Sequence, residues 1–132
     1  MSTSCKEGTP RRCFLQAVVS VPLVSFWTSP SAANDVVTAL RGVFLRPASA
    51  RSVGLAVLRG RTGPSAKHDL VAELEEHRPE LCEACGVVSR DRLASMLCDA
   101  RRSDFEGGHT VIVDGWLLGR SEALVCALIA VG

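Results

Sequence analysis

The sequence predicts a mainly α-helical fold, a small helical bundle of about four to five helices with a short C-terminal β-hairpin before the last helix. Apolar residues recur at helical spacing in four segments between residues 35 and 106. From residue 109 the pattern changes to β-branched and apolar residues on either side of an Asp-Gly pair, which is typical of a tight hairpin. Residues 123–131 are apolar on nearly every face, and such a helix must be buried.

The first two predicted helices are separated by a proline. Asn34 is suited to cap the first helix, because its side chain can accept a hydrogen bond from a free N–H of the first turn. Pro47 fits the first turn of a second helix, which ends at Gly60, and the Gly-Pro content of residues 61–65 indicates a turn. The first helix, near residues 35–45, is predicted by one apolar face made of Val36, Val37, Leu40, Val43 and Phe44.

Two further helices are predicted in the middle of the chain. Residues 67–77 carry apolar side chains on one face, and Pro79 closes this helix. Ser89 caps the next helix, which ends before Gly107-Gly108. The apolar faces consist of Leu70, Val71 and Leu74 in the earlier helix and of Leu93, Met96, Leu97 and Ala100 in the later one. Short connections between the four helices fit an antiparallel arrangement.

The end of the chain is predicted to form the hairpin and a last helix. Residues 109–113 and 116–118 are the expected strands, with Asp114-Gly115 as the two-residue turn. Trp116 is expected to fill the core, because a large aromatic side chain buries much apolar surface. Ser121 is expected to cap the last helix, which either fills the centre of the domain or docks into another subunit.

The charge balance argues against two classes of partner. The 132 residues are 47% hydrophobic and 22% charged, with a formal net charge of +1. Nucleic acids and anionic membranes bind proteins with a clustered excess of Lys and Arg, so no nucleic-acid partner is expected. Arginines do gather in the first two predicted helices, opposed only by Asp35: Arg41, Arg46, Arg51, Arg59 and Arg61. They form a solvated face or, as the alternative, a surface that docks an acidic partner.

The first 33 residues have the features of an export signal. A pair of arginines is followed by a Phe-Leu pair and then by a moderately apolar stretch at residues 17–27. This pattern resembles a twin-arginine (Tat) signal peptide, with Pro10 and Gln16 as departures from the usual motif. The motif residues are Arg11, Arg12, Phe14 and Leu15.

Small residues after the apolar stretch predict a cleavage site. Ser31 and Ala33 stand at the two positions that a signal peptidase recognises, so the mature domain is expected to begin at Asn34 and to comprise residues 34–132. The apolar stretch has about a dozen residues, whereas a membrane span needs roughly 20, so no permanent membrane anchor is expected. The resemblance implies export in the folded state by the Tat translocase, and a periplasmic or secreted location.

Four cysteines follow the predicted signal peptide: Cys82, Cys85, Cys98 and Cys126. An even number in an oxidising compartment favours one or two disulfide bridges, and four cysteines allow three pairings. Cys82 and Cys85 also have metal-ligand spacing, with Cys98 and His77 as further candidate ligands, but the second close ligand pair of a structural zinc site is missing. A redox-active dithiol and buried free thiols are the remaining alternatives, and no cofactor is predicted.

No other residues have the spacing of a familiar catalytic site. Residues 113–128 resemble the C-terminal segment of small Tat-exported proteins, and the size and signal are similar to those of the small subunits of flavin-dependent periplasmic dehydrogenases. The Tat-like signal, the small domain, the lack of a catalytic set and the all-apolar last helix together favour a non-catalytic accessory subunit or maturation partner, exported folded with a larger periplasmic redox enzyme. The alternative is an independent periplasmic metal-binding or thiol-redox protein that uses Cys82 and Cys85. An enzyme with an unfamiliar active site ranks third.

Overall fold

The computed structural model describes residues 30–63 and 65–132. This part of the chain is mainly helical and contains one two-stranded antiparallel hairpin before the last helix, so the predicted fold class is confirmed. The elements are α1 (Pro30–Val43), α2 (Pro47–Gly60), α3 (Lys67–His77), α4 (Pro79–Ala84), α5 (Arg90–Gly107), β1 (Thr110–Val113), β2 (Trp116–Gly119) and α6 (Arg120–Val131).

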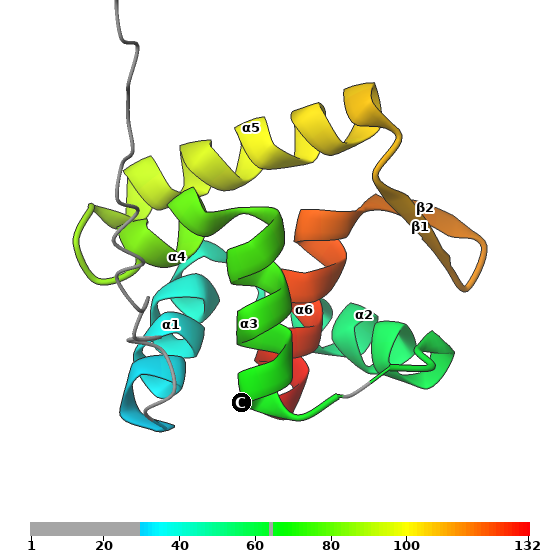
Figure 1. The fold of residues 1–132 in the computed structure, drawn as a ribbon, viewed down its shortest axis with the longest axis horizontal. Helices are drawn as coiled ribbons and strands as arrows, with labels where there is room; N and C mark the ends of the chain where they lie inside the picture. Colours follow the sequence, from blue (N-terminus) through cyan, green and yellow to red (C-terminus); the bar gives the residue numbers. More distant parts are fainter. Residues whose placement is uncertain (1–29, 64) are drawn as a thin grey trace, which may run out of the picture.

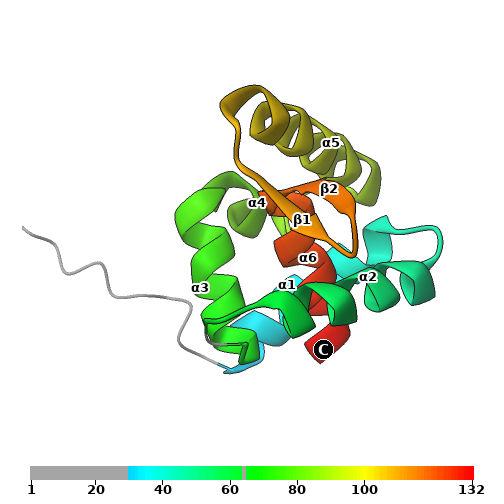
Figure 2. The ribbon, with the colours of Figure 1, turned by 90° about the vertical axis from the view of Figure 1, so that its right-hand side faces the viewer.

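Helix α6 occupies the centre of the fold. It contacts α1, α2, α3 and α5, and Figures 1 and 2 show these helices arranged around it, with α5 across one end. Every residue from Ala123 to Ile129 is buried. The sequence left two destinations open for this apolar helix, and the structure shows that it fills the centre of the domain.

The packing of α2 on α6 is especially close at Gly54. This glycine is buried, and a Cβ atom built on it would overlap the backbone carbonyl group of Cys126 in α6. Only a residue without a side chain therefore allows the two backbones to approach to this distance.

Helices α2 and α3 have the predicted bounds, whereas α1 begins earlier than expected. Asn34 does not cap α1, because the helix already starts at Pro30. Ala33 extends the apolar face of Val36, Val37 and Leu40 by one helical step and is itself buried, which explains the earlier start. The Asn34 side chain instead accepts a hydrogen bond of 2.7 Å from Lys67 Nζ at the start of α3.

The short helix α4 was missed by the sequence analysis. Pro79 was expected only to close the preceding helix, and α3 does end two residues before it. Proline is also compatible with a first helical turn, because the missing N–H has no partner there, and Pro79 begins α4 in this way. The new helix buries Leu81, Cys82 and Ala84 against the core.

The ends of α5 and the hairpin turn agree with the sequence. Ser89 Oγ accepts a hydrogen bond of 3.2 Å from the Arg92 N–H, and Gly108 ends α5 in a left-handed conformation with a φ of 74°. Asp114 and Gly115 have φ values of 49° and 83°, as a two-residue turn with two positive φ angles requires.

Two predictions near the hairpin were wrong. Ser121 does not cap α6: Gly119 holds the capping position, and Ser121 lies buried in the first turn of the helix. Trp116 does not fill the core but is 74% exposed. It pairs with Val113 directly beside the turn, at the end of the hairpin that projects from the helices in Figure 1.

We expect Gly54→Ala to destabilise the fold. The added methyl group collides with the α6 backbone, and overpacking of this kind costs about 1–3 kcal/mol or more. Gly42→Ala is the matched control, because Gly42 lies in exposed helix with open space around its Cα, and alanine there should add up to about 1 kcal/mol. Urea unfolding followed by circular dichroism measures both, and equal stability of the two variants would contradict the close approach.

Candidate functional site

Asp104 connects three elements through a buried carboxylate. It lies near the end of α5 and is completely buried. Its Oδ1 atom is 2.7 Å from Arg78 Nη2 and 2.9 Å from His77 Nε2, both at the end of α3. Its Oδ2 atom accepts a hydrogen bond of 2.6 Å from the backbone N–H of Ser121, in the first turn of α6. The carboxylate therefore ties α3, α5 and α6 together.

The position of this carboxylate is favourable for its negative charge. A helix N-terminus carries partial positive charge and N–H groups without helical partners, and Asp104 meets that end of α6. Burial acts to raise the pKa of Asp104, but hydrogen bonds from Arg78, Ser121 and His77 outweigh burial and lower the pKa to about 2. Asp104 is therefore ionised at neutral pH, and a charged group without these partners would not be tolerated at this depth.

His77 belongs to the Asp104 contacts and not to the cysteines. Its ring lies edge-on to the ring of His109, with centroids 5.5 Å apart, where the chain leaves α5 for the hairpin. Among residues 30–63 and 65–132, no group of three or more His, Cys, Asp or Glu side chains is arranged to hold a metal ion. The predicted combination of His77 with Cys82, Cys85 and Cys98 is thus not brought together.

Asp104 was missed by the sequence analysis, although a signal was present. It continues the apolar face of α5, in which the preceding buried positions are Leu93, Leu97 and Ala100. These positions repeat at the spacing of a core-facing helical stripe. A carboxylate at a core-facing position predicts a buried charge with dedicated partners, and this signal could have identified the residue.

A second ionic cluster lies at the start of α6. Glu73 Oε2 is 2.6 Å from Arg61 Nη2, and Glu73 Oε1 is 3.2 Å from Arg120 Nη2, so one carboxylate is shared by two guanidinium groups. The hydrogen bond from Arg61 is the main cause that lowers the pKa of Glu73, with Arg120 adding to it and burial opposing it. The cluster connects the segment after α2 to α3 and α6.

The hairpin arm, which we define as residues 110–119, exposes apolar side chains. Ile112 is 76% exposed, Trp116 74% and Leu117 53%. The arm spans the space between α5 and α2 in Figure 2. A groove of about 420 Å³ lies between the arm and α2, and its mainly apolar lining comprises Ser52, Val53, Ala56, Val113, Asp114, Trp116 and Leu118.

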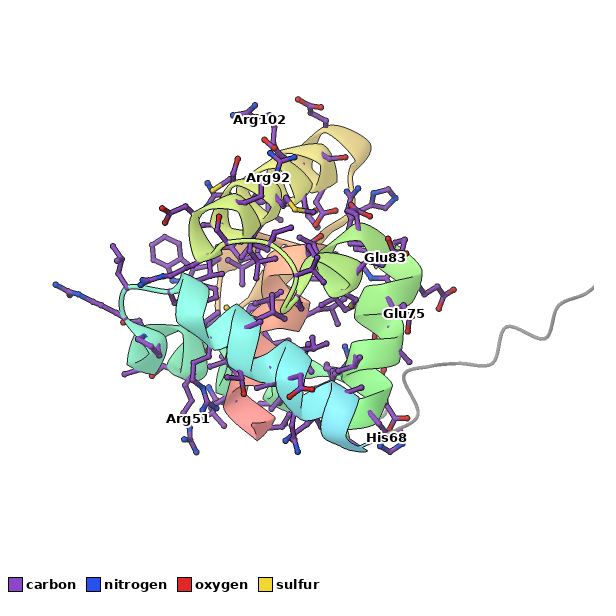
Figure 3. The ribbon with its side chains drawn as sticks, turned by 90° about the vertical axis from the view of Figure 1, so that its left-hand side faces the viewer. Arg51, His68, Glu75, Glu83, Arg92 and Arg102 are labelled. Carbon is purple, nitrogen blue, oxygen red and sulfur yellow. The ribbon has the colours of Figure 1, made fainter. Side chains whose placement is uncertain are left out.

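Acidic and basic side chains are unevenly distributed among the first four described helices. Residues 30–63 contain five arginines and one acidic residue, Asp35, whereas α3 and α4 together carry six acidic residues. Glu75 and Glu83 project from the α3–α4 side of the molecule, and Arg92 and Arg102 project from α5, as Figure 3 shows. Burial is the main cause of a raised pKa at Glu75, and the like charge of Glu83 adds to it.

The four described cysteines are free thiols, so the predicted disulfide bridges are not formed in this structure. Burial raises the pKa of Cys82 to about 12, of Cys85 to about 11 and of Cys126 to about 12. Cys98 is exposed on α5. The Cys85 Sγ donates to the Leu81 carbonyl oxygen over 3.1 Å. Thiols with such raised pKa values remain protonated at neutral pH and are poor nucleophiles and metal ligands.

The predicted signal motif, Arg11, Arg12, Phe14 and Leu15, lies outside the described residues. The predicted cleavage bond after Ala33 lies within α1, together with Ser31 and Asn34. Because Ala33 is 3% exposed, cleavage of this bond requires local unwinding of the start of α1. None of the described helices is long and apolar enough to cross a membrane.

We expect Asp104→Asn to lower the free energy of unfolding by about 3 kcal/mol, because loss of the carboxylate charge leaves the mostly buried Arg78 guanidinium without its ionic partner. The control is Asp99→Asn on the same helix, where the side chain is exposed and the change should stay within about 0.5 kcal/mol. Chemical denaturation measures both variants. If Asp104→Asn lowers the free energy of unfolding no more than Asp99→Asn does, the Asp104 carboxylate does not hold α3, α5 and α6 together as described.

The same carboxylate predicts acid sensitivity. Its pKa falls from an ordinary value of 3.8 to about 2 in the fold, so its stabilising contribution is complete above about pH 4 and is lost as the pH falls towards 2. Unfolding measured between pH 5 and pH 2 should show a decline in the native chain, with a shallower decline in Asp104→Asn. Parallel pH profiles would argue against a depressed pKa at this residue.

Three features of the described residues therefore present distinctive chemistry or surface. They are the buried Asp104 carboxylate with its partners, the Arg61–Glu73–Arg120 cluster, and the hairpin arm with its groove. No protein-family model matches the chain, and neither a curated protein nor a solved structure matches it.

Proposed function

We propose that this protein is an exported, non-catalytic accessory subunit or maturation partner of a larger periplasmic redox enzyme. The proposal includes translocation in the folded state by the Tat pathway. The observation that carries the binding part of the proposal is the exposure of Ile112, Trp116 and Leu117 on the hairpin arm. The export part rests on the resemblance of residues 11–33 to a twin-arginine signal peptide.

The hairpin arm has the composition of a protein-binding surface. Ile112 and Leu117 are cross-strand partners on one face of the arm, whereas Trp116 lies on the other face, which lines the groove. Tryptophan is among the residues that contribute most to protein interfaces, and exposed apolar residues that lie close together mark interaction sites. Full burial of one large apolar side chain stabilises a complex by about 1.5–3 kcal/mol, so three of them offset much of the roughly 4–15 kcal/mol that association costs. The groove beside Trp116 offers room for a side chain of the partner.

Backbone hydrogen bonds at the base of the arm support this use of it. His109 N–H donates to the Asp104 carbonyl oxygen over 2.8 Å, and Arg120 N–H donates to the His109 carbonyl oxygen over 2.9 Å. Both ends of the arm are therefore held by hydrogen bonds where α5 ends and α6 begins. A two-stranded hairpin is marginally stable by itself, so this attachment presents its apolar residues in a fixed orientation.

The thiol-redox alternative receives less support from the geometry. A redox-active Cys-x-x-Cys pair needs a thiolate at neutral pH, whereas burial raises the pKa of both Cys82 and Cys85. Cys82 is also fully buried, which shields its sulfur from thiols and oxidants in solution.

Co-purification tests the proposal. With a C-terminal affinity tag on the full chain expressed in its own cell, we expect a larger enzyme subunit to be recovered in a fixed ratio from the periplasmic fraction. The variant Ile112→Ser, Trp116→Ser, Leu117→Ser should reduce this recovery at least tenfold, because it removes the apolar surface that the partner covers.

Matched controls separate binding from export. Leu45→Ser with Val87→Ser removes side chains that are 90% and 80% exposed but lie away from the hairpin arm, so recovery should not change. Replacement of Arg11 and Arg12 by Lys should keep both proteins out of the periplasm. Recovery of the tagged chain alone, or full recovery of the partner by the hairpin variant, would contradict the proposal.

A further inference from the structure

A hollow of about 330 Å³ lies between α2, β1 and the first turn of α6, next to the groove described above. Part of its wall is apolar and comes from Val57, Val111 and Leu124 in these three elements. At roughly 30 Å³ for a water-sized group, the hollow has room for about ten non-hydrogen atoms. This is the size range of small-ligand sites in proteins.

Charged side chains line the rest of this hollow, with one positive charge in excess. Three arginines, Arg59, Arg61 and Arg120, face two carboxylates, Glu73 and Asp114. Glu73 pairs with both Arg61 and Arg120, whereas Asp114 meets Arg59 across the mouth over 3.4 Å. Two guanidinium groups thus share one carboxylate.

Arg120 is an accessible arginine of this hollow and can bind an anion. It is 42% exposed, whereas Arg61 is only 18% exposed. A guanidinium group has five N–H donors, and among the described residues the Arg120 guanidinium donates one hydrogen bond, to Glu73 Oε1. Arginine binds carboxylates through two parallel hydrogen bonds, a geometry that open donors on Arg120 allow.

We propose that this hollow is a binding site for a monoanionic carboxylate carried on a small apolar group. The carboxylate would bind Arg120, and the apolar group would pack on Val57, Val111 and Leu124. A monoanion matches the single excess positive charge, whereas a phosphate dianion would leave a net negative charge in a partly apolar hollow. This site does not depend on the accessory role proposed above.

Two sources supply this chemistry, namely a free short-chain carboxylic acid and the C-terminal carboxylate of a peptide. Calorimetric titration of the full chain with 4-methylpentanoate and with N-acetyl-Val-Leu distinguishes them, and the tighter ligand identifies the source. For each probe the neutral amide should bind at least tenfold more weakly, because it lacks the charge. Acetate should also bind more weakly, because it lacks the apolar group.

Variants test the role of Arg120. Arg120→Gln should weaken binding of the carboxylate at least tenfold, and Arg120→Lys should retain part of it, because a positive charge remains without the planar donor pair. Arg102→Gln is the control, because Arg102 projects from α5 outside the hollow, and it should bind as the native chain does. Thermal unfolding of each variant checks that the fold is retained.

Three outcomes would overturn the proposal: no binding of either carboxylate, equal affinity for acid and amide, or equal loss in the Arg102 and Arg120 variants. If Arg120→Gln does not fold, the comparison of acid with amide on the native chain still decides the question. These outcomes are independent of the partner recovery that tests the accessory role.

Discussion

The covering of α6 on every side is the constraint on which the rest of the structure depends. A helix whose residues from Ala123 to Ile129 are all apolar cannot be left at the surface of a domain this small. Helices α1, α2, α3 and α5 therefore each turn their apolar faces towards it. The closest of these contacts, on α2, is possible because Gly54 has no side chain.

Apolar packing alone does little to fix the direction and position of a helix that is apolar on every side. The hydrogen bonds of Asp104 fix both for α6. Its carboxylate accepts the Ser121 N–H at the polar start of α6 and pairs with Arg78 and His77 at the end of α3. An apolar contact could slide, whereas a buried charge is tolerated only where its hydrogen bonds are complete. The specific polar contact therefore sets the register of a core held together by non-directional apolar packing.

The sequence predicted most of the fold because most elements are encoded locally. The apolar stripes of α2, α3 and α5, the Ser89 cap and the Asp114-Gly115 turn depend on residues a few positions apart. The exposure of Trp116 depends instead on the direction in which the hairpin extends, and the burial of Ser121 depends on the packing of Asp104 against the start of α6. Only tertiary packing determines both.

The candidate sites were harder to predict for the same reason. The four cysteines have suggestive spacing, but the fold leaves all four as free thiols. The cluster that does form brings Glu73 to Arg120, 47 positions away, and no local pattern connects those residues. The place of Asp104 on an apolar helix face indicated a buried charge, but no local pattern in the sequence indicated its partners on α3 and α6.

The position of α6 in the chain has a consequence for biosynthesis. This helix follows every other described element, so a nascent chain that has released α1 to α5 from the ribosome still lacks the element on which they pack. Helices α1, α3, α4 and α5 can pack on one another before then, but the faces that α6 covers stay exposed until α6 is made. Much of the apolar surface of these helices is therefore open to chaperones until α6 has emerged and packed between them.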